Sequence, residues 1–214
     1  LLSSSDLPAF YYSVLVSEQR AESNRFTDLL DASELQHLQA VRDLHDRERA
    51  GGVTSDGARV AFCLATLAMG DLNATAFAQA GHVEMVRQAG AMPPDRTISY
   101  RQPWPRGDVA QGIMIDDSLV VAQVPRRAPK TSPAATDARD LYERTLHAYR
   151  ARGIADVPHK RQVEVHDAVV WGAEMRGLRG DVGVPRQRRV PLAAVTFRLG
   201  QLGCCPTDIL RRVL

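Results

Sequence analysis

The sequence predicts a mixed α+β domain, because short apolar runs alternate with charged, helix-prone segments and the spacing of some runs is typical of hairpins. The chain has 214 residues, of which 44% are hydrophobic and 24% charged, as in an ordinary folded protein. This length is enough for one large domain or for a domain with an appendage. We therefore expect strands and helices to be interspersed along the chain.

The first half of the chain is expected to combine β-prone and helical segments. Leucine and valine at helical spacing predict an inserted helix at about 31–50, capped by Asp31 or Ser33. Gly90 ends a second helix. The expected elements are a β-prone run at 12–16, helical residues within 17–50, a strand at 58–67 and a helix at 74–89.

The second half is expected to hold more strands, separated by loops and two helices. Asp137 is the predicted cap of the first of these helices, and Gly153 is its expected end. The expected elements are a proline-rich loop at 91–110, a hairpin around 116–117, a linker at 125–136, a helix at 137–153, short strands within 162–184, and a last helix from Pro191 through Leu202.

Residues 112–121 contain two adjacent carboxylates between apolar runs. The runs are short and rich in Ile, Met and Val, which predicts two buried strands hinged at Asp116-Asp117. Two neighbouring anions repel each other and lose hydration, so a cation is expected to compensate them. A pair of Mg²⁺ ions would do this, while an ordinary Asp-Asp turn is the alternative.

The charge of the chain is nearly balanced, with a net value of +2, so the total does not indicate nucleic-acid binding. Of 27 basic residues only Lys130 and Lys160 are lysines, which leaves 25 arginines. Arginine favours bidentate contacts with phosphate, but a GC-rich genome would produce the same bias.

The three cysteines provide neither a disulfide framework nor a zinc-binding spacing, which predicts free thiols in a reducing compartment. No apolar window is long enough to span a membrane, and no signal peptide is recognisable. We expect an intracellular protein, cytoplasmic or nuclear and not secreted. The start at Leu1 and the end within a helical pattern suggest a segment of a larger protein.

Four motifs occur in a fixed order along the chain. Asp6 precedes an aromatic run, a glycine turn at 67–74 leads into a helix, Met114-Ile115-Asp116-Asp117 lies between apolar runs, and Lys160 precedes Val169-Val170-Trp171-Gly172. A second glycine-bearing hairpin follows at 180–184. This order resembles the palm of reverse transcriptases, most closely those of retrotransposon-like elements, over nearly the whole chain.

The resemblance implies a polymerase palm with a small antiparallel sheet backed by helices, and the start of a thumb connection. It divides the chain into a palm core at 1–124, a linker at 125–136, a palm helix with hairpins at 137–189, and a truncated thumb helix at 190–214. The implied function is template-directed DNA synthesis, RNA-directed, by two-metal phosphoryl transfer. The implied partners are a primer–template nucleic acid and deoxynucleoside triphosphates, without a membrane.

By the same resemblance, the catalytic and metal-binding carboxylates are Asp6, Asp116 and Asp117. The backbone carbonyl of Leu7 is an expected further ligand, because hard cations accept carbonyl oxygens. The implied cofactor is two Mg²⁺ or Mn²⁺ ions, which hold the phosphates for in-line transfer. For Asp6, a helix cap is the structural alternative, since Pro8 follows closely.

The resemblance also assigns nucleotide-binding roles to Tyr11, Gly70, Gln79 and Lys160. The Tyr11 ring would lie beneath the incoming sugar and clash with a ribose 2′-OH. Gly70 would let the backbone approach the nucleotide, and Gln79 would lie on the supporting helix. Lys160 would be an acid for the leaving pyrophosphate. Core packing for Tyr11 and a solvated surface position for Lys160 are the alternatives.

Two other functions remain open at this point. The stretch containing Asp71 and Asn73 also resembles the Gly-Asp-x-Asn strand end of metal-dependent endonucleases and phosphatases, although their Ser-Asp-His signature is missing. A catalytically dead, polymerase-like module that only binds nucleic acid is the third reading. His82, His159 and His166 have no zinc spacing and are assigned no role.

Several positions depart from the reverse-transcriptase pattern. Met114 replaces the usual tyrosine, Ala68 the usual proline, and Asp71 places an acid in the glycine turn. The fingers would precede residue 1, and the thumb would be cut short. A fragment or a decayed copy of a mobile element is therefore expected.

Overall fold

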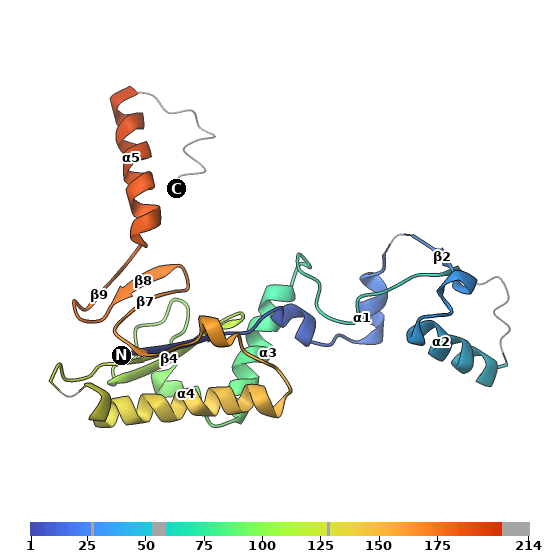
Figure 1. The fold of residues 1–214 in the computed structure, drawn as a ribbon, viewed down its shortest axis with the longest axis horizontal. Coiled ribbons are helices and arrows are strands. Elements are labelled where there is room, and N and C mark those ends of the chain that lie inside the picture. The colour runs from blue at the N-terminus through green and yellow to red at the C-terminus, as the bar shows by residue number, and fades with distance from the viewer. Residues whose placement is uncertain (27, 53–58, 128, 203–214) are drawn as a thin grey trace. The chain divides into compact units, whose positions relative to one another are not determined.

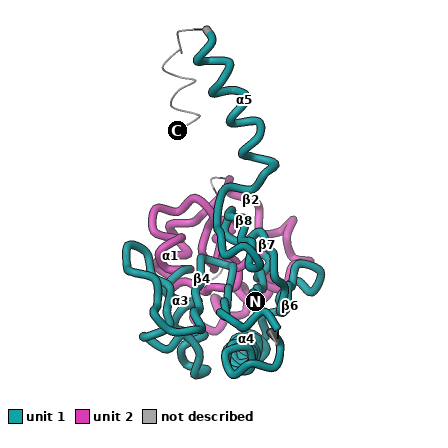
Figure 2. Tube along the Cα trace, turned by 90° about the vertical axis from the view of Figure 1, so that its left-hand side faces the viewer, with its two compact units in different colours: residues 1–8, 79–214 teal, residues 9–78 magenta. Residues whose placement is uncertain are grey.

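The computed structural model describes residues 1–26, 28–52, 59–127 and 129–202. They are grouped in two compact units, one formed by residues 1–8 and 79–214 and the other by residues 9–78 (Figure 2). The described residues form small antiparallel sheets and five α-helices, so the predicted mixed α+β class is confirmed. None of these helices is both long enough and apolar enough to cross a membrane.

The first unit is built on a four-stranded antiparallel sheet with the strand order β4-β5-β1-β6 (Figure 1). Its strands are β1 (Leu2–Asp6), β4 (Val109–Met114), β5 (Asp117–Ala122) and β6 (Gln162–Val165). Strands β4 and β5 form the predicted hairpin, and β1 pairs with the other edge of β5. The N-terminal strand thus lies in the middle of the sheet.

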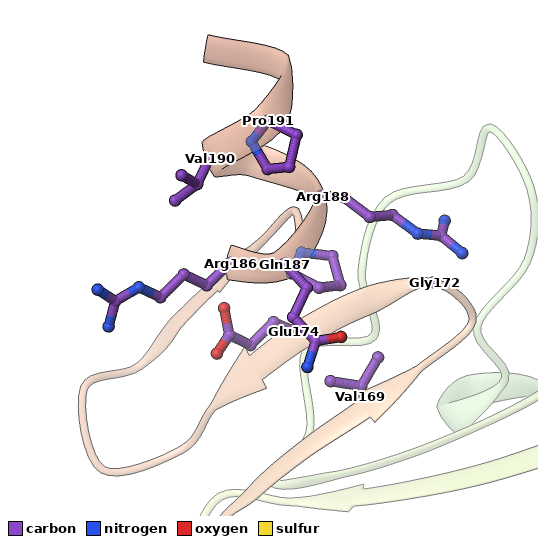
Figure 3. A pocket seen from close by; sticks show the side chains of 9 residues that line it. Val169, Gly172, Glu174, Arg186, Gln187, Arg188, Val190 and Pro191 are labelled. Atoms are coloured by element: carbon purple, nitrogen blue, oxygen red, sulfur yellow. The ribbon is translucent and has the colours of Figure 1, made fainter. Parts of the chain in front are cut away.

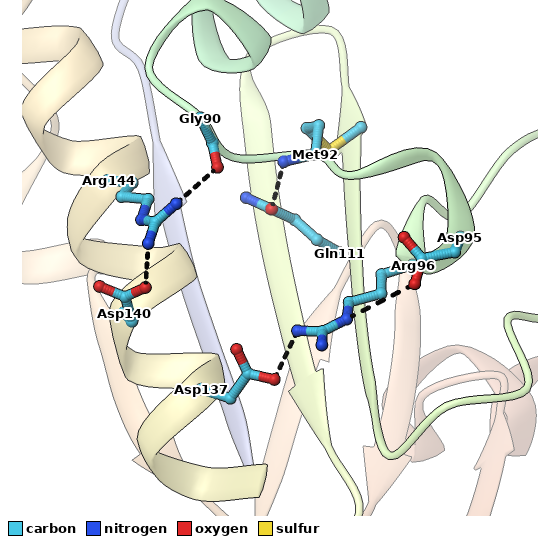
Figure 4. Close-up of polar contacts among 8 residues, drawn as sticks. All are labelled: Gly90, Met92, Asp95, Arg96, Gln111, Asp137, Asp140 and Arg144. Carbon is cyan, nitrogen blue, oxygen red and sulfur yellow. Dashed lines mark hydrogen bonds and ion pairs between the residues drawn. The ribbon is translucent and has the colours of Figure 1, made fainter.

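Helix α4 (Pro133–Ala151) packs on one face of this sheet, and α3 (Ala74–Gln88) is hydrogen-bonded to the end of the β4–β5 hairpin. Gln111 on β4 is fully buried and donates to Thr145 Oγ1 of α4 at 2.7 Å. Its Oε1 accepts a hydrogen bond from the backbone N–H of Met92 (Figure 4). A buried amide therefore joins the sheet, α4 and the loop after α3. Its hydrogen bonds are expected, because buried polar groups nearly always have partners.

The start of α4 differs from the prediction. Ser132, rather than Asp137, is the cap, and its Oγ accepts a hydrogen bond from the N–H of Ala135 at 3.3 Å. Asp137 instead forms an ion pair with Arg96, which lies in the 3-10 helix before β4 (Figure 4). Pro133 at the first helical position suits this earlier start, because its missing N–H would have no helical partner.

A second, three-stranded sheet covers the other face of the first. It consists of β7 (Asp167–Val170), β8 (Ala173–Arg176) and β9 (Asp181–Gly183). Leu2 and Leu119 pack there against Ala168 and Val170 in a common apolar cluster. A Cβ on Gly112 would lie 2.4 Å from Cη2 of Trp171, so the indole lies directly on the β4 backbone and requires glycine at this position.

The final helix of the described residues, α5 (Arg186–Leu202), begins earlier than the predicted start at Pro191. The carbonyl of Pro185 accepts hydrogen bonds from the N–H groups of Arg188 and Arg189, which begins the helix before the internal proline. Short 3-10 helices occur at Pro94–Arg96, Pro129–Thr131 and Pro158–Lys160.

The second unit has less regular structure than the sequence predicts. Its elements are a 3-10 helix at Phe10–Ser13, α1 (Glu18–Ser23), β2 (Leu30–Asp31), a 3-10 helix at Ala32–Leu35, α2 (Gln39–Ala50) and β3 (Arg59–Val60). The predicted β-prone run at 12–16 is therefore wrong, because Tyr12 and Ser13 belong to the 3-10 helix and only Leu15 forms an isolated bridge, with Thr66. Of the predicted strand at 58–67, only Arg59–Val60 form one, and residue 58 lies outside the described residues.

Candidate active site at the β4–β5 hairpin

The strand register brings two of the predicted carboxylates together. Strands β1 and β5 are antiparallel, and Asp6 lies directly opposite Asp117. The next pair along the ladder, Ser5 and Ser118, is joined through its hydroxyl oxygens at 2.7 Å. Because side chains alternate between the faces of a sheet, Asp6 and Asp117 share the face opposite that of the serine pair. Two carboxylates that are 111 positions apart in the sequence thus lie side by side on neighbouring strands.

The hairpin turn is shifted by one residue from the prediction. Met114 pairs with Asp117, so the turn consists of Ile115 and Asp116, and the predicted hinge at Asp116-Asp117 is wrong in position. Asp117 is the first residue of β5, while Asp116 lies at the tip. One carboxylate therefore faces Asp6 across the strands, and its neighbour extends from the turn.

Ile115 has an unfavourable backbone conformation, with a φ of 58°. In this left-handed region a β-branched side chain crowds its own backbone, which costs about 1–3 kcal/mol. Asparagine or glycine is the usual residue in such hairpin turns. A conformation of this kind persists only if the surrounding structure holds it.

Two side chains of α3 hold the backbone of Ile115. The N–H of Ile115 donates to Oε1 of Gln79 at 2.7 Å, and Nε2 of the same amide donates to the carbonyl of Ile113 at 2.9 Å. Nδ1 of His82 lies 2.7 Å from the carbonyl of Ile115. Gln79 and His82 are three residues apart and lie on one helix face. We call this set of contacts the hairpin clamp.

The chemistry of the clamp fixes the state of His82. A carbonyl can only accept, so Nδ1 carries the proton, and Nε2 of the neutral ring accepts from the hydroxyl of Tyr149 at 2.8 Å. Burial lowers the pKa of His82 to about 4, partly offset by the hydrogen bond to Ile115. The sequence assigned no role to this histidine, although its spacing from Gln79 was a usable signal.

Backbone hydrogen bonds attach the end of β1 to the hairpin. The N–H of Leu7 donates to the carbonyl of Asp116 at 3.0 Å, and the carbonyl of Asp6 accepts from Val157 at 3.0 Å. Asp6 is the last residue of β1 and does not cap a helix. The role of the Leu7 carbonyl as a metal ligand stays a prediction.

Negative charge accumulates at this site. Burial and the charges of Asp116 and Asp6 together raise the pKa of Asp117 to about 6, while Lys160 acts in the opposite sense. Lys160 forms an ion pair with the carboxylate of Asp6, and this contact raises the pKa of its ammonium group. The fold thus brings the predicted Lys160 next to the carboxylates, where its positive charge partly offsets theirs.

The donors present here suit a hard divalent cation, since all three are carboxylates and their repulsion is incompletely compensated. The three carboxylates are, however, not arranged around one point. Within the described part of the chain, no three His, Cys, Asp or Glu side chains converge as a metal-binding group. The Asp6 carboxylate is engaged by Lys160 instead. Metal binding by Asp6, Asp116 and Asp117 therefore stays a prediction.

A hollow of about 340 Å³ lies beside the carboxylates and is lined by Asp6, Asp117, Lys160, Gln162 and Trp171, among others. Nε1 of Trp171 and Oε1 of Gln162 are buried and have no hydrogen-bond partner among the described residues. Such groups usually signal a missing polar partner, in the form of water or ligand. Neither residue was a predicted site residue.

A larger hollow of about 880 Å³ adjoins the turn between β7 and β8. Figure 3 shows Glu174 and Val169 on the strands below it, and Arg186 and Arg188 extending from the first turn of α5. Neither arginine of this helix start was a predicted site residue.

Two predicted nucleotide-binding residues belong to the second unit. The hydroxyl of Tyr11 lies 3.1 Å from Oγ1 of Thr75, and Gly70 has a φ of 94°, a conformation that favours glycine. Their position beside an incoming nucleotide stays a prediction. In the same unit, Asp71 is paired with the guanidinium of Arg20.

No model of a protein family matches this chain, and a search of curated proteins finds no significant match. Solved structures provide a likeness of fold. Three structures of the foamy viral protease–reverse transcriptase match 90% of this chain at 10% identity, each with a TM-score of 0.53. Two of them are complexes with double-stranded DNA and one is a complex with an RNA/DNA hybrid.

The matching region is a small part of those proteins. This chain covers 23%, 28% and 18% of the three foamy viral chains. At 10% identity the likeness concerns the fold alone. The α+β fold of this chain therefore resembles that of the matching part of the foamy viral protease–reverse transcriptase.

The hairpin clamp predicts a coupling between Gln79 and Ile115. We expect Gln79→Ala to lower the free energy of unfolding by about 2 kcal/mol, because two backbone groups of the turn lose their partner. Ile115→Gly removes the strain, so it should restore more stability in the Gln79→Ala background than in the wild type. Urea unfolding of the four proteins measures this difference. Gln123→Ala, which changes an exposed glutamine after β5, is the control, and a purely additive cycle would contradict the clamp.

The charge at Asp117 predicts a dependence of stability on pH. Its pKa rises from 3.8 to about 6 on folding, so its contribution is present at low pH and is lost as the pH rises through this window. Allowing for solvent screening of a half-buried group, Asp117→Asn should gain about 1 kcal/mol over the wild type between pH 4 and pH 7. Comparing the two proteins cancels the contribution of His82, which has the opposite sign. An equal difference at both pH values would refute this account of Asp117.

Proposed function

We propose that this chain is the palm part of a reverse-transcriptase-like polymerase that extends a primer with deoxynucleotides. In that reaction the primer 3′-oxygen forms a bond to the α-phosphorus of the triphosphate, and the bond from this phosphorus to pyrophosphate breaks. The observation that carries the proposal is the register of Asp6 opposite Asp117, next to Asp116. The likeness to the foamy viral enzymes supports it at the level of fold.

In this proposal Asp6, Asp116 and Asp117 hold two Mg²⁺ or Mn²⁺ ions, together with the carbonyl of Leu7. Bound ions would neutralise charge on the transferred phosphoryl group and favour ionisation of the primer hydroxyl. The charge that raises the pKa of Asp117 supports this assignment, because a divalent cation relieves it. Lys160 would leave Asp6 when a cation arrives, and would then give a proton to the departing pyrophosphate.

The hairpin clamp would serve the reaction by fixing the position of Asp116. Phosphoryl transfer needs its charged groups in place before substrate arrives, and a turn held from both sides moves little. Gln79 would thus act on the nucleotide through the hairpin. Tyr11 would exclude the ribose 2′-OH, and Gly70 would allow close approach of the backbone.

The proposed partner is a primer–template duplex, bound through its backbone rather than its sequence. Arg186 and Arg188 beside the larger hollow offer guanidinium groups for phosphate contacts. The unpaired N–H of Trp171 and the unpaired oxygen of Gln162 offer a donor and an acceptor next to the carboxylates. A nucleotide in the smaller hollow would satisfy both.

The alternative phosphodiesterase function finds less support. It requires Asp71 as a metal ligand, but Arg20 donates to the Asp71 carboxylate from Nε at 3.1 Å and also from its terminal nitrogen. A cation would first have to displace this arginine.

Mg²⁺-dependent primer extension tests the proposal. With a labelled primer–template, we expect Asp116→Asn and Asp117→Asn each to reduce extension by roughly 100-fold or more, because the charges that hold the ions are lost. Asp46→Asn changes an exposed acid on α2 and should leave extension unchanged. Hydrolysis of the nucleic acid that survives Asp116→Asn but is lost in Asp71→Asn would instead establish the phosphodiesterase. Duplex binding without extension by the wild type would establish the inactive binding module.

A further inference from the structure

The loop that leads into β4 exposes aromatic rings next to arginines. We call residues 99–107 the aromatic loop. Tyr100 is 85% exposed and Trp104 is 56% exposed. Rings of this size are normally covered, because burying one is strongly favourable. Two of them on one short loop therefore indicate a surface that is covered by something else.

Hydrogen bonds and prolines constrain the backbone of the aromatic loop and therefore the positions of its rings. A turn closes where the N–H of Gln102 donates to the carbonyl of Ser99 at 3.2 Å. Pro103 and Pro105 restrict the chain on both sides of Trp104. The base of the loop is fixed to β4 by a 2.7 Å hydrogen bond from Ile98 to Gln111.

The charge of the aromatic loop has one sign. Arg101 and Arg106 are its only ionisable side chains besides the hydroxyl of Tyr100, and it contains no acid. The guanidinium carbon of Arg101 lies 5.1 Å from the centroid of the Tyr100 ring, within cation–π range. Since the ring is 85% exposed, stacking of arginine on one side leaves ring surface accessible to a ligand.

This combination matches the chemistry of an unpaired nucleic-acid strand. Successive bases stack on aromatic rings, and arginines pair with the phosphates between them. A duplex offers no free base faces, and its bases cannot reach such rings without unstacking. A docked protein is the other possible occupant, because Tyr, Trp and Arg are also enriched at protein interfaces, but two arginines without an acid in the aromatic loop favour a polyanion.

Trp104 has room for a base beside it. It borders a hollow of about 570 Å³ whose lining includes Arg126 and His166, the acids Asp108 and Asp181, and several aliphatic side chains. This hollow lies by the Val109 end of β4, whereas the carboxylates are at the Met114 end, roughly 15 Å away at the usual rise of a strand. The two places are therefore separate.

We propose that the aromatic loop binds single-stranded nucleic acid, with bases stacked on Tyr100 and Trp104 and phosphates paired with Arg101 and Arg106. Under the proposed function this strand is an unpaired part of the template. The binding itself requires neither the carboxylates nor the divalent ions.

The test uses the tryptophans as reporters, because the chain contains only two, Trp104 and Trp171. An unlabelled oligonucleotide of mixed sequence, about 12 nucleotides long, is titrated into the full chain. Base stacking quenches indole fluorescence, so we expect quenching in the wild type and in Trp171→Phe, and its loss in Trp104→Phe. Quenching that persists in Trp104→Phe and disappears in Trp171→Phe would overturn the proposal.

Affinity provides the second measurement, by fluorescence anisotropy of the same oligonucleotide carrying a dye. Tyr100→Ala combined with Trp104→Ala should raise the Kd by about tenfold or more, and this ratio should change little with salt, because stacking is not ionic. Phe26→Ala removes an equally exposed ring elsewhere and should leave the Kd unchanged. An unchanged Kd in the double variant would also overturn the proposal.

The outcomes separate this inference from the proposed function. Asp116→Asn should abolish primer extension and leave single-strand binding intact. If the wild type extends primers but binds no single strand, the aromatic loop proposal fails alone. If single-strand binding follows Tyr100 and Trp104 while no variant extends a primer, the proposed function fails alone. A wild type that dimerises in sedimentation and becomes monomeric in Trp104→Ala would assign the loop to self-association and overturn the proposal.

Discussion

The structure of this site depends on the left-handed backbone of Ile115. A β-branched residue with a φ of 58° is unfavourable, and it is held by hydrogen bonds from Gln79 and His82 on α3. His82 is held in turn by Tyr149 of α4, so the turn is tied to both helices. If the turn relaxed, the register between β4 and β5 would change. Asp116 in the turn would then move relative to Asp117, which the β1–β5 register holds opposite Asp6.

The same arrangement separates polar and charged groups between the two faces of the sheet. The serine pair, Ser5 and Ser118, lies on the face towards α4, where hydroxyls satisfy each other. The carboxylates lie on the other face, beside a hollow with an unpaired donor and an unpaired acceptor. Strain at Ile115, like-charge repulsion at Asp117 and unpaired polar atoms all destabilise the fold. Their concentration at one place is what a binding site for a charged ligand requires.

The sequence predicted the parts of this site that depend on local pattern. The apolar runs around residues 112–121 predicted the hairpin, and the spacing of residues 74–89 predicted α3. Strand β1 was missed, because Ser3, Ser4 and Ser5 have little β propensity and are fixed only by pairing with β5. The turn was misplaced by one residue because aspartate, rather than isoleucine, is the ordinary turn former. The clamp depends on partners more than thirty residues apart, which no local pattern reveals.

The central claim is that Asp6, Asp116 and Asp117 form one cation site. Anomalous diffraction from crystals of the chain soaked in Mn²⁺ would test it most directly, because the signal locates the metal without reference to any activity. The account predicts Mn²⁺ within about 2.5 Å of carboxylate oxygens from both β1 and the hairpin, with Lys160 moved away from Asp6. Mn²⁺ bound beside Asp71 and absent from these three carboxylates would contradict it.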